Sequence, residues 1–196
     1  QHRHVQPASF TLYKENEAAG GYQVVMGAND ATDTYAINHT IGDDNKRAFF
    51  QNKDCRFALN YALNREELNE LVYDGVNIPR QYSPPTGSPQ FYPKLSYAYL
   101  EYDPDKANAL LDQAGYTQRD SEGYRLWPDG SGRVGFIIES NASVGSPDED
   151  EMQVVAKYWG DIGLDVQVNL AERGLIEERK SANLMDCRNT WCSRAV

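Results

Sequence analysis

The residues of this 196-residue chain that could do nucleophilic or metal chemistry are three cysteines and three histidines. None of the cysteines, Cys55, Cys187 and Cys192, lies in a CxxC pair or another spacing typical of a metal site. His2 and His4 would share one face of a predicted strand, but a metal site needs a third ligand that the sequence does not supply. We therefore predict neither a metal site nor a cofactor.

Two arrangements of side chains could support hydrolysis. Cys187 or Cys192 could act as a nucleophile with His39 as its base, although only the residue types support this pairing. Neighbouring acids, which can act as acid and base, occur three times: Glu66 with Glu67, Glu177 with Glu178, and Asp148 to Glu151. Helix first turns and solvated faces explain these acids better, because carboxylates there complement the helix dipole. A small hydrolase using Cys192 or an acidic pair stays an alternative.

A candidate binding segment, RNTWC at residues 188–192, lies at the carboxyl end of the last predicted strand. Open α/β sheets bind ligands beyond this end of their strands, and a tryptophan there offers an apolar surface with one N–H donor. A core tryptophan at Trp191 explains the segment equally well. We predict no catalytic residue in it.

The elements that must position this segment alternate along the second half of the chain. We predict strands at residues 134–138, 164–170 and 185–190, and helices at 147–162 and 175–181. Ser146 caps the longer helix and Gly163 ends it. A strand-helix-strand-helix-strand order implies parallel strands with right-handed crossovers, so we predict an α/β fold with an open mixed sheet and flanking helices.

The first part of the chain is predicted to add helices and a hairpin. Asp103 is the N-cap and Pro104 the first residue of a helix that Gly115 ends. Asn64 caps the second of two helices within residues 53–73. The other expected elements are an extended stretch in 1–12, a short helix at 14–19, strands at 22–26 and 34–39, a polar connector at 41–52, and strands at 123–127 and 133–139.

Residues 76–102 form a long predicted loop with five prolines and six aromatic residues. A loop of this length inside a domain either is functional or covers an apolar surface, and we favour the covering role. A protein-interaction domain that uses this loop as its contact surface is a further alternative.

Composition excludes some partners and leads us to expect a piece of a longer protein. The formal net charge of −10 argues against nucleic acid, which is bound by clustered Lys and Arg. No apolar run reaches the roughly 18 residues of a membrane helix, and no export signal opens the chain. The chain also starts and stops abruptly, inside predicted structure.

Five segments, in order and spacing, resemble the family 5 extracellular solute-binding proteins of ABC importers. They are NKDCRFALNYALNREEL (52–68), VYDG (72–75), YDPDKANALLDQAGY (102–116), WPDG (127–130) and WGDIGLDV (159–166). The segment YKENEAAGGY (13–22) resembles one branch of the same family. The family includes oligopeptide-, dipeptide- and nickel-binding proteins, and its members are longer than this chain.

This resemblance implies that residues 1–196 are a single lobe, the second α/β lobe of a periplasmic-binding-protein-like type II fold. Such a lobe closes over a small solute, here expected to be a peptide, against a missing first lobe, and the protein delivers the solute to a membrane permease. It also implies an extracytoplasmic location, in some members with a lipid anchor. Residues 1–5 and 185–191 would be the segments that cross between the lobes.

The resemblance also nominates the solute-binding residues. In relatives a tryptophan on the returning segment touches the solute, and Trp191 with Cys192 resembles that element. Arg188 and Asn189 are weaker candidates on the same segment. The acidic residue that follows in peptide binders has no counterpart here, because Ser193 and Arg194 stand in its place.

Overall fold

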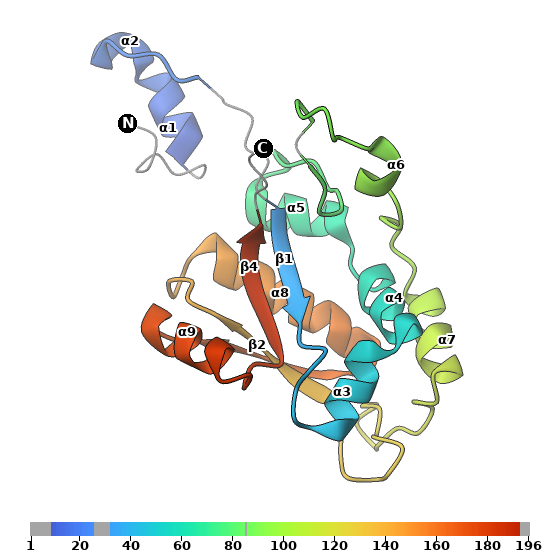
Figure 1. Ribbon diagram of the computed structural model, residues 1–196. Helices are drawn as coiled ribbons and strands as arrows, with labels where there is room; N and C mark the ends of the chain where they lie inside the picture. Colours follow the sequence, from blue (N-terminus) through green and yellow to red (C-terminus); the bar gives the residue numbers. More distant parts are fainter. Residues whose placement is uncertain (1–8, 26–31, 85, 193–196) are drawn as a thin grey trace.

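The structure is a computed structural model that describes residues 9–25, 32–84 and 86–192 (Figure 1). Thr32, Trp191 and Cys192 are described for their backbone only. Helices and strands pack in layers around a central sheet, which confirms the predicted mixed α/β class. Among the described residues, no helix combines the length and apolar character needed to cross a membrane.

The sheet has four strands in the order β1-β4-β2-β3. Their bounds are Thr32–Ile37 for β1, Gly135–Ser140 for β2, Asp165–Leu170 for β3 and Cys187–Cys192 for β4. Strand β2 pairs in parallel with both β3 and β4, whereas β1 is antiparallel to β4. The predicted open mixed sheet and its parallel second half are therefore confirmed.

Two helical crossovers join the parallel strands. Helix α8 (Pro147–Asp161) links β2 to β3, and α9 (Arg173–Ser181) links β3 to β4. The Ser146 side chain caps α8 as predicted, and Gly163 ends it with a φ of 91° that suits glycine. Because β3 and β4 lie on opposite sides of β2, two right-handed crossovers place α8 and α9 on opposite faces of the sheet.

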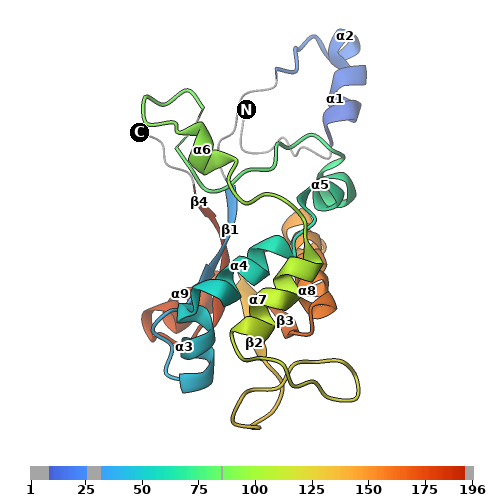
Figure 2. The same ribbon diagram turned by 90° about the vertical axis from the view of Figure 1, so that its right-hand side faces the viewer.

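The face that carries α8 is covered by further helices, and two of them, α4 and α7, lie side by side in Figure 2. The bounds are Asp44–Gln51 for α3, Lys53–Tyr61 for α4, Arg65–Tyr73 for α5 and Pro104–Gln113 for α7. The predicted caps Asn64 and Asp103 each accept a backbone N–H of the helix that they begin. Both predicted caps are therefore confirmed. A cap can be predicted from sequence because its side chain bonds a backbone N–H within one helical turn.

The prediction of a polar connector over residues 41–52 is wrong, because α3 lies there. Its N-cap Asp43 accepts from the backbone N–H of Lys46, and its buried residues are Phe49 and Phe50. Two adjacent phenylalanines in an otherwise polar segment give no helical period, so the apolar pattern does not reveal this helix.

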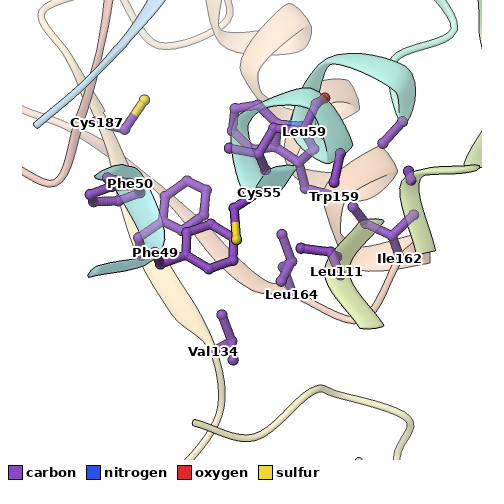
Figure 3. Close-up of a cluster of buried hydrophobic side chains, with 14 of the residues drawn as sticks. Phe49, Phe50, Cys55, Leu59, Leu111, Val134, Trp159, Ile162, Leu164 and Cys187 are labelled. Carbon is purple, nitrogen blue, oxygen red and sulfur yellow. The ribbon is translucent and has the colours of Figure 1, made fainter. Parts of the chain in front are cut away.

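The core lies between the sheet and the layer of α3, α4, α7 and α8 (Figure 3). Phe49 meets the rings of Phe50 and Tyr116 edge to face. The indole N–H of Trp159 donates to the backbone oxygen of Leu59 at 2.9 Å, which ties α8 to α4. Cys55 is fully buried in this core, as the sequence predicts.

The N-terminal hairpin predicted from residues 22–26 and 34–39 is wrong. Short helices α1 (Phe10–Glu15) and α2 (Glu17–Gly20) replace the extended stretch at 9–12 and extend the short helix expected at 14–19. Residues 22–25 form no strand, and β1 pairs instead with β4, far along the chain. Residues 1–8, with His2 and His4, and residue 26 lie outside the described part.

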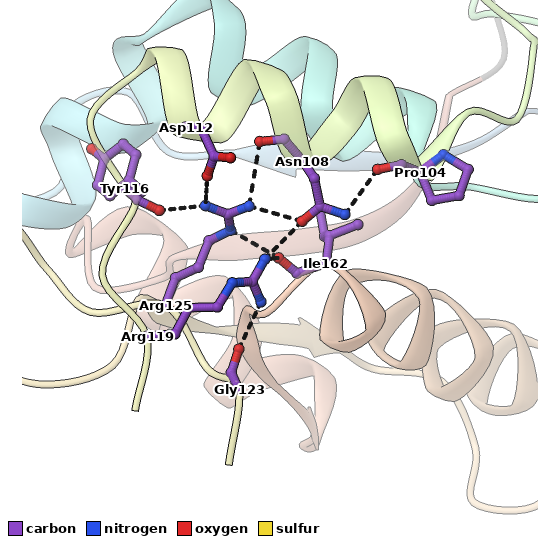
Figure 4. Close-up of polar contacts among 8 residues, drawn as sticks. All are labelled: Pro104, Asn108, Asp112, Tyr116, Arg119, Gly123, Arg125 and Ile162. Atoms are coloured by element: carbon purple, nitrogen blue, oxygen red, sulfur yellow. Dashed lines mark hydrogen bonds and ion pairs between the residues drawn. The ribbon is translucent and has the colours of Figure 1, made fainter. Parts of the chain in front are cut away.

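The second predicted hairpin, at residues 123–139, is reduced to two isolated antiparallel bridges, Arg119 to Arg125 and Leu126 to Arg133. The buried guanidinium of Arg125 instead holds this loop by hydrogen bonds to α7 and to the residues that follow α7 and α8 (Figure 4). It donates to the backbone oxygens of Ile162 and Tyr116, to the Asn108 side chain and to the carboxylate of Asp112.

Residues 76–102 follow the surface beside α4 and contain one short helix, α6 (Pro93–Ser96). Tyr99 packs its ring edge-on against Phe57, and its backbone oxygen accepts from the Asn60 amide. Several apolar side chains of this segment nevertheless stay at least half exposed: Val76, Ile78, Tyr92, Leu95, Tyr97 and Tyr99. The segment is thus held to α4 through Tyr99 and Gln81 and to α5 through Asn77, while these apolar side chains stay open to solvent.

Candidate functional site at the carboxyl edge of the sheet

The candidate site lies where the parallel strands end. Because β2, β3 and β4 run in the same direction, their carboxyl ends lie along one edge of the sheet. An open hollow of about 420 Å³ lies beyond β2 and β3 and is lined by Asn141, Ala142, Val144, Leu170, Ala171, Glu172 and Arg173. This edge has the position at which open α/β sheets bind small molecules.

The structure places the four predicted site residues on β4 and directs the side chains of Arg188 and Asn189 to opposite faces of the strand. Arg188 donates to Glu177 of α9 at 2.7 Å and lines a second hollow of about 210 Å³ beside that helix. Asn189 is 5% exposed and lies opposite Tyr35 of β1. Successive residues of a strand point to opposite faces, so Arg188 and Asn189 cannot contact the same ligand group.

Trp191 and Cys192 occupy the last two positions of β4. Their backbones pair with Asp33 and Thr32 of β1, which places both at the carboxyl edge. Their side chains lie outside the described part of the structure, so their contact with a solute stays a prediction.

Beside this end of β4 the structure assembles an acidic cluster, which we define as Asp33, Asp148 and Glu151. Tyr35 donates to one oxygen of Glu151 at 2.8 Å, and Tyr73 donates to the other at 2.6 Å. The hydroxyl of Tyr73 also lies 3.4 Å from Oδ2 of Asp33. Strand β1, the end of α5 and the start of α8 supply these residues and meet at this place (Figure 1).

Burial and mutual repulsion perturb the acidic cluster strongly. Burial, with the charges of Glu151 and Asp148, raises the pKa of Asp33 to about 7. Burial also raises the pKa of Glu151, although the hydrogen bonds from Tyr73 and Tyr35 partly oppose this shift. The ion pairs between described residues do not involve Asp33, Asp148 or Glu151.

Two polar atoms beside the acidic cluster are buried without a hydrogen-bond partner among the described residues. They are Oδ1 of Asp33 and Nδ2 of Asn189. A buried polar atom without a partner costs about 1–3 kcal/mol, so such atoms in a folded protein require an explanation. Both lie on the face of the β1–β4 pair that carries Tyr35, because Asn189 is opposite Tyr35 and Asp33 is two residues away.

The acidic cluster was not predicted as a unit. Asp148 to Glu151 were explained by a helix first turn or a solvated face; the first turn of α8 does hold Asp148 to Asp150, but a solvated face is wrong for Glu151, which is 5% exposed. The helical spacing held a signal: Glu151 precedes Val155 by four residues and therefore shares the buried stripe of α8. No comparable signal marks Asp33 or Tyr73, which reach the cluster only through the tertiary fold.

The described residues do not assemble the predicted Cys–His pair. Cys187 is fully buried, and burial raises the pKa of its thiol, which disfavours the reactive thiolate. His39 is exposed, and its backbone oxygen accepts from Gln51. In the part of the chain that the structure describes, no group of three His, Cys, Asp or Glu residues could hold a metal ion.

The other neighbouring acids have structural partners. Glu67 accepts from the hydroxyl of Tyr158 at 2.8 Å, and Glu177 accepts from Arg188. These contacts join α5 to α8 and α9 to β4. They explain both pairs, Glu66 with Glu67 and Glu177 with Glu178, without acid–base chemistry.

Comparison with known proteins places this fold among solute-binding proteins. The family model for bacterial extracellular solute-binding proteins, family 5 Middle, matches residues 4–191. The oligopeptide-binding protein AppA of Bacillus subtilis is 30% identical over 175 residues, which are 88% of this chain and 30% of AppA. The oligopeptide-binding protein OppA of Lactococcus lactis subsp. lactis is 27% identical over 135 residues, 68% of this chain and 22% of that protein.

Solved structures agree with this placement. The structure of an oligopeptide-binding protein OppA has a TM-score of 0.84 and 39% identity, and the match covers 96% of this chain and 29% of that one. The periplasmic binding protein MelB of Agrobacterium fabrum, solved with stachyose, has a TM-score of 0.80 at 18% identity and supports the fold alone. This chain thus spans less than a third of the length of these proteins, and it belongs to the bacterial extracellular solute-binding proteins of family 5.

Proposed function

We propose that this chain is one lobe of the substrate-binding protein of an ABC importer. In the intact protein it would bind a small solute, most readily a peptide, in a cleft against a second lobe and deliver it to the membrane permease. The family match over residues 4–191 carries this proposal, together with the oligopeptide-binding proteins AppA and OppA, of which the matched parts are 30% and 22% of the length.

The geometry of the carboxyl edge supports a role as half of a cleft. The larger hollow is open rather than enclosed, and its lining comes from the two loops that follow β2 and β3. The start of β1 and the end of β4 pair with each other at the same edge. Both connections to a second lobe would therefore leave the sheet beside the bound solute, as a hinge requires.

The predicted contact residues keep their place in this proposal. Trp191 and Cys192 would lie beside the solute at the end of β4, with Asn189 behind Trp191 on the same face of the strand. Arg188 is the weakest of the four, because its guanidinium is already paired with Glu177. Closure would follow from a population shift, since a solute that contacts both lobes stabilises only the closed state.

The intact protein would bind its solute without a catalytic step. The intact protein would be exported and act outside the cytoplasm, in some hosts held by a lipid anchor. Bound peptide would be released unchanged, which mass spectrometry of the ligand recovered from the protein can check. Cleaved peptide in that measurement would favour the hydrolase alternative instead.

Calorimetric titration of alanine peptides tests the proposal directly. We expect the full-length gene product that contains this chain to bind a peptide with micromolar or better affinity. The 196-residue chain alone should bind at least about 100-fold more weakly, because it offers half of the contacts. Equal affinity of the two proteins would contradict the lobe assignment, and no binding by the full-length protein would contradict the peptide assignment.

A further inference from the structure

In the described part of segment 76–99, polar side chains are buried while large apolar side chains are exposed. Ser83 and Ser96 are buried, and the hydroxyl of Ser96 donates to that of Ser83 at 2.6 Å. Leu95 and Tyr97 flank the fully buried Ser96, yet each is 50% exposed. We define the outer face of the segment as its six large exposed apolar side chains: Val76, Ile78, Tyr92, Leu95, Tyr97 and Tyr99.

Hydrogen bonds hold the backbone beneath the outer face. The backbone N–H of Gln81 donates to the backbone oxygen of Ser96 at 2.8 Å, which joins the two halves of the segment. The side-chain amide of Asn69 in α5 donates to the backbone oxygen of Asn77 at 2.8 Å. The side-chain amide of Gln81 donates to Asn60 of α4 at 3.0 Å. The outer face is therefore presented by a backbone that is fixed to two helices.

A surface of this composition is typical of an interface. Single exposed apolar side chains are common, but six within one short segment form a patch of the kind that marks a binding surface. Residues 76–100 also contain no acidic residue, although the whole chain has 29. The centres of protein interfaces are depleted of acidic residues and enriched in tyrosine. We therefore expect the partner to present an apolar surface.

The outer face lies at the end of the sheet where a second lobe would be connected. Tyr73, three residues before Val76, donates to Glu151 at 2.6 Å and lies 3.4 Å from Oδ2 of Asp33. Asp33 pairs in turn with Trp191 at the end of β4. Figures 1 and 2 agree that α6 lies beyond this end of the sheet, where β1 begins and β4 ends. A lobe joined through these two strands would come next to the outer face.

We propose that the outer face packs against the second lobe of the intact protein and keeps this contact with and without solute. The matched parts are only 30% of AppA and 22% of OppA, so a protein of that length has ample chain to supply the partner surface. A contact beside the connections moves little when a hinge closes, and it spares the open protein an exposed apolar patch. This inference rests on the proposed function and adds a fixed interface to it.

Hydroxyl-radical footprinting with mass spectrometry tests this interface, because the oxidation rate of a side chain follows its exposure. Tyr92, Leu95 and Tyr97 should be oxidised at least about 5-fold more slowly in the full-length gene product than in the 196-residue chain, since packing removes them from solvent. Saturation with an alanine peptide should not change these rates. Leu184 is the internal control, because it is 58% exposed near the start of β4, at the opposite end of that strand. It should react equally in both proteins.

Thermal unfolding of matched variants gives a second measurement. Leu95→Ser removes apolar surface without changing the charge. In the full-length protein it should lower the unfolding midpoint by at least about 2 °C, because the leucine is buried there. In the 196-residue chain the shift should stay below about 1 °C, since Leu95 is half exposed. Leu184→Ser is the matched control and should shift neither midpoint by more than about 1 °C.

The outcomes separate this interface from the proposed function and from other partners. Equal oxidation of the outer face in the two proteins would overturn the interface. Protection that appears only with peptide would assign the face to the solute, and protection lost on dilution together with a sedimenting dimer would assign it to a second copy. Either result overturns the proposal. If the full-length protein protects the outer face but binds no peptide, the proposed solute fails and the interface stands.

Discussion

At the scale of single residues, the charged groups of Arg125 and Asp33 differ in how far hydrogen bonds satisfy them. The guanidinium of Arg125 is fully buried, and it donates to three backbone oxygens, an amide oxygen and a carboxylate. Asp33 is half-buried with one of its carboxylate oxygens unfilled. The hydrogen bonds of Arg125 stabilise the loop around it. The carboxylate of Asp33 has no such set of donors, so its negative charge is unfavourable in this half-buried position.

The raised pKa of Asp33 predicts a specific dependence of stability on pH. Its pKa is 3.8 in the unfolded chain and about 7 in the folded one, so the unfolded state loses its proton first as pH rises. Stability from this group is complete below about pH 4 and is lost between pH 4 and 7. Urea unfolding of Asp33→Asn should show a gain over the unaltered chain that grows by about 3–4 kcal/mol across this range.

Asp150→Asn is the control for this measurement, since Asp150 is exposed on the same helix as Glu151. Its difference from the unaltered chain should not change between pH 4 and 7. A constant difference for Asp33→Asn as well would show that Asp33 titrates normally and that the acidic cluster is not strained.

At the scale of elements, short local signals and close backbone contacts determine where helices and strands begin and end. The caps Asn64, Asp103 and Ser146 each start a helix where the sequence places it. Strand β2 begins at Gly135, where a Cβ atom would lie 2.5 Å from the backbone oxygen of Asp165 in β3. The absence of a side chain at Gly135 therefore permits the first pair of the β2–β3 ladder.

Two glycine substitutions, one at Gly135 and one at Gly160, test whether Gly135 is needed for steric reasons. Gly135→Ala should destabilise the chain by about 1–3 kcal/mol, because the backbone of β3 must move to admit the methyl group. Gly160→Ala should stabilise it by about 0.5–1 kcal/mol, since Gly160 lies inside α8 and a Cβ there meets nothing within 4 Å. Urea unfolding measures both, and equal effects would exclude a steric role for Gly135.

At the scale of the whole molecule, the strand order decides where the functional edge lies. The crossovers through α8 and α9 bring the carboxyl ends of β2, β3 and β4 to one edge, and the antiparallel β1 begins at that edge. The acidic cluster, the open hollow and the end of β4 are consequently all found there. A second lobe placed against this edge would cover the solute and complete its contacts.

Small-angle X-ray scattering can detect the closure that this arrangement predicts. The full-length gene product should become more compact on saturation with a peptide, because the solute stabilises the closed state. The 196-residue chain should show no change with the same peptide. An unchanged radius of gyration for the full-length protein, despite measured binding, would contradict closure of the two lobes.

The sequence by itself determined the class of fold and the positions of α4, α5, α7 and α8, because caps, glycine stops and apolar stripes act over one or two turns. It indicated the family through the segments that resemble family 5. It also located the end of β4 as a candidate site from the order of predicted strands. Only the tertiary structure revealed that β1 pairs with β4, and that Asp33, Tyr73 and Glu151 meet. These residues are up to 118 positions apart, as 151 − 33 shows, and no local pattern encodes such contacts, which depend on how the layers pack.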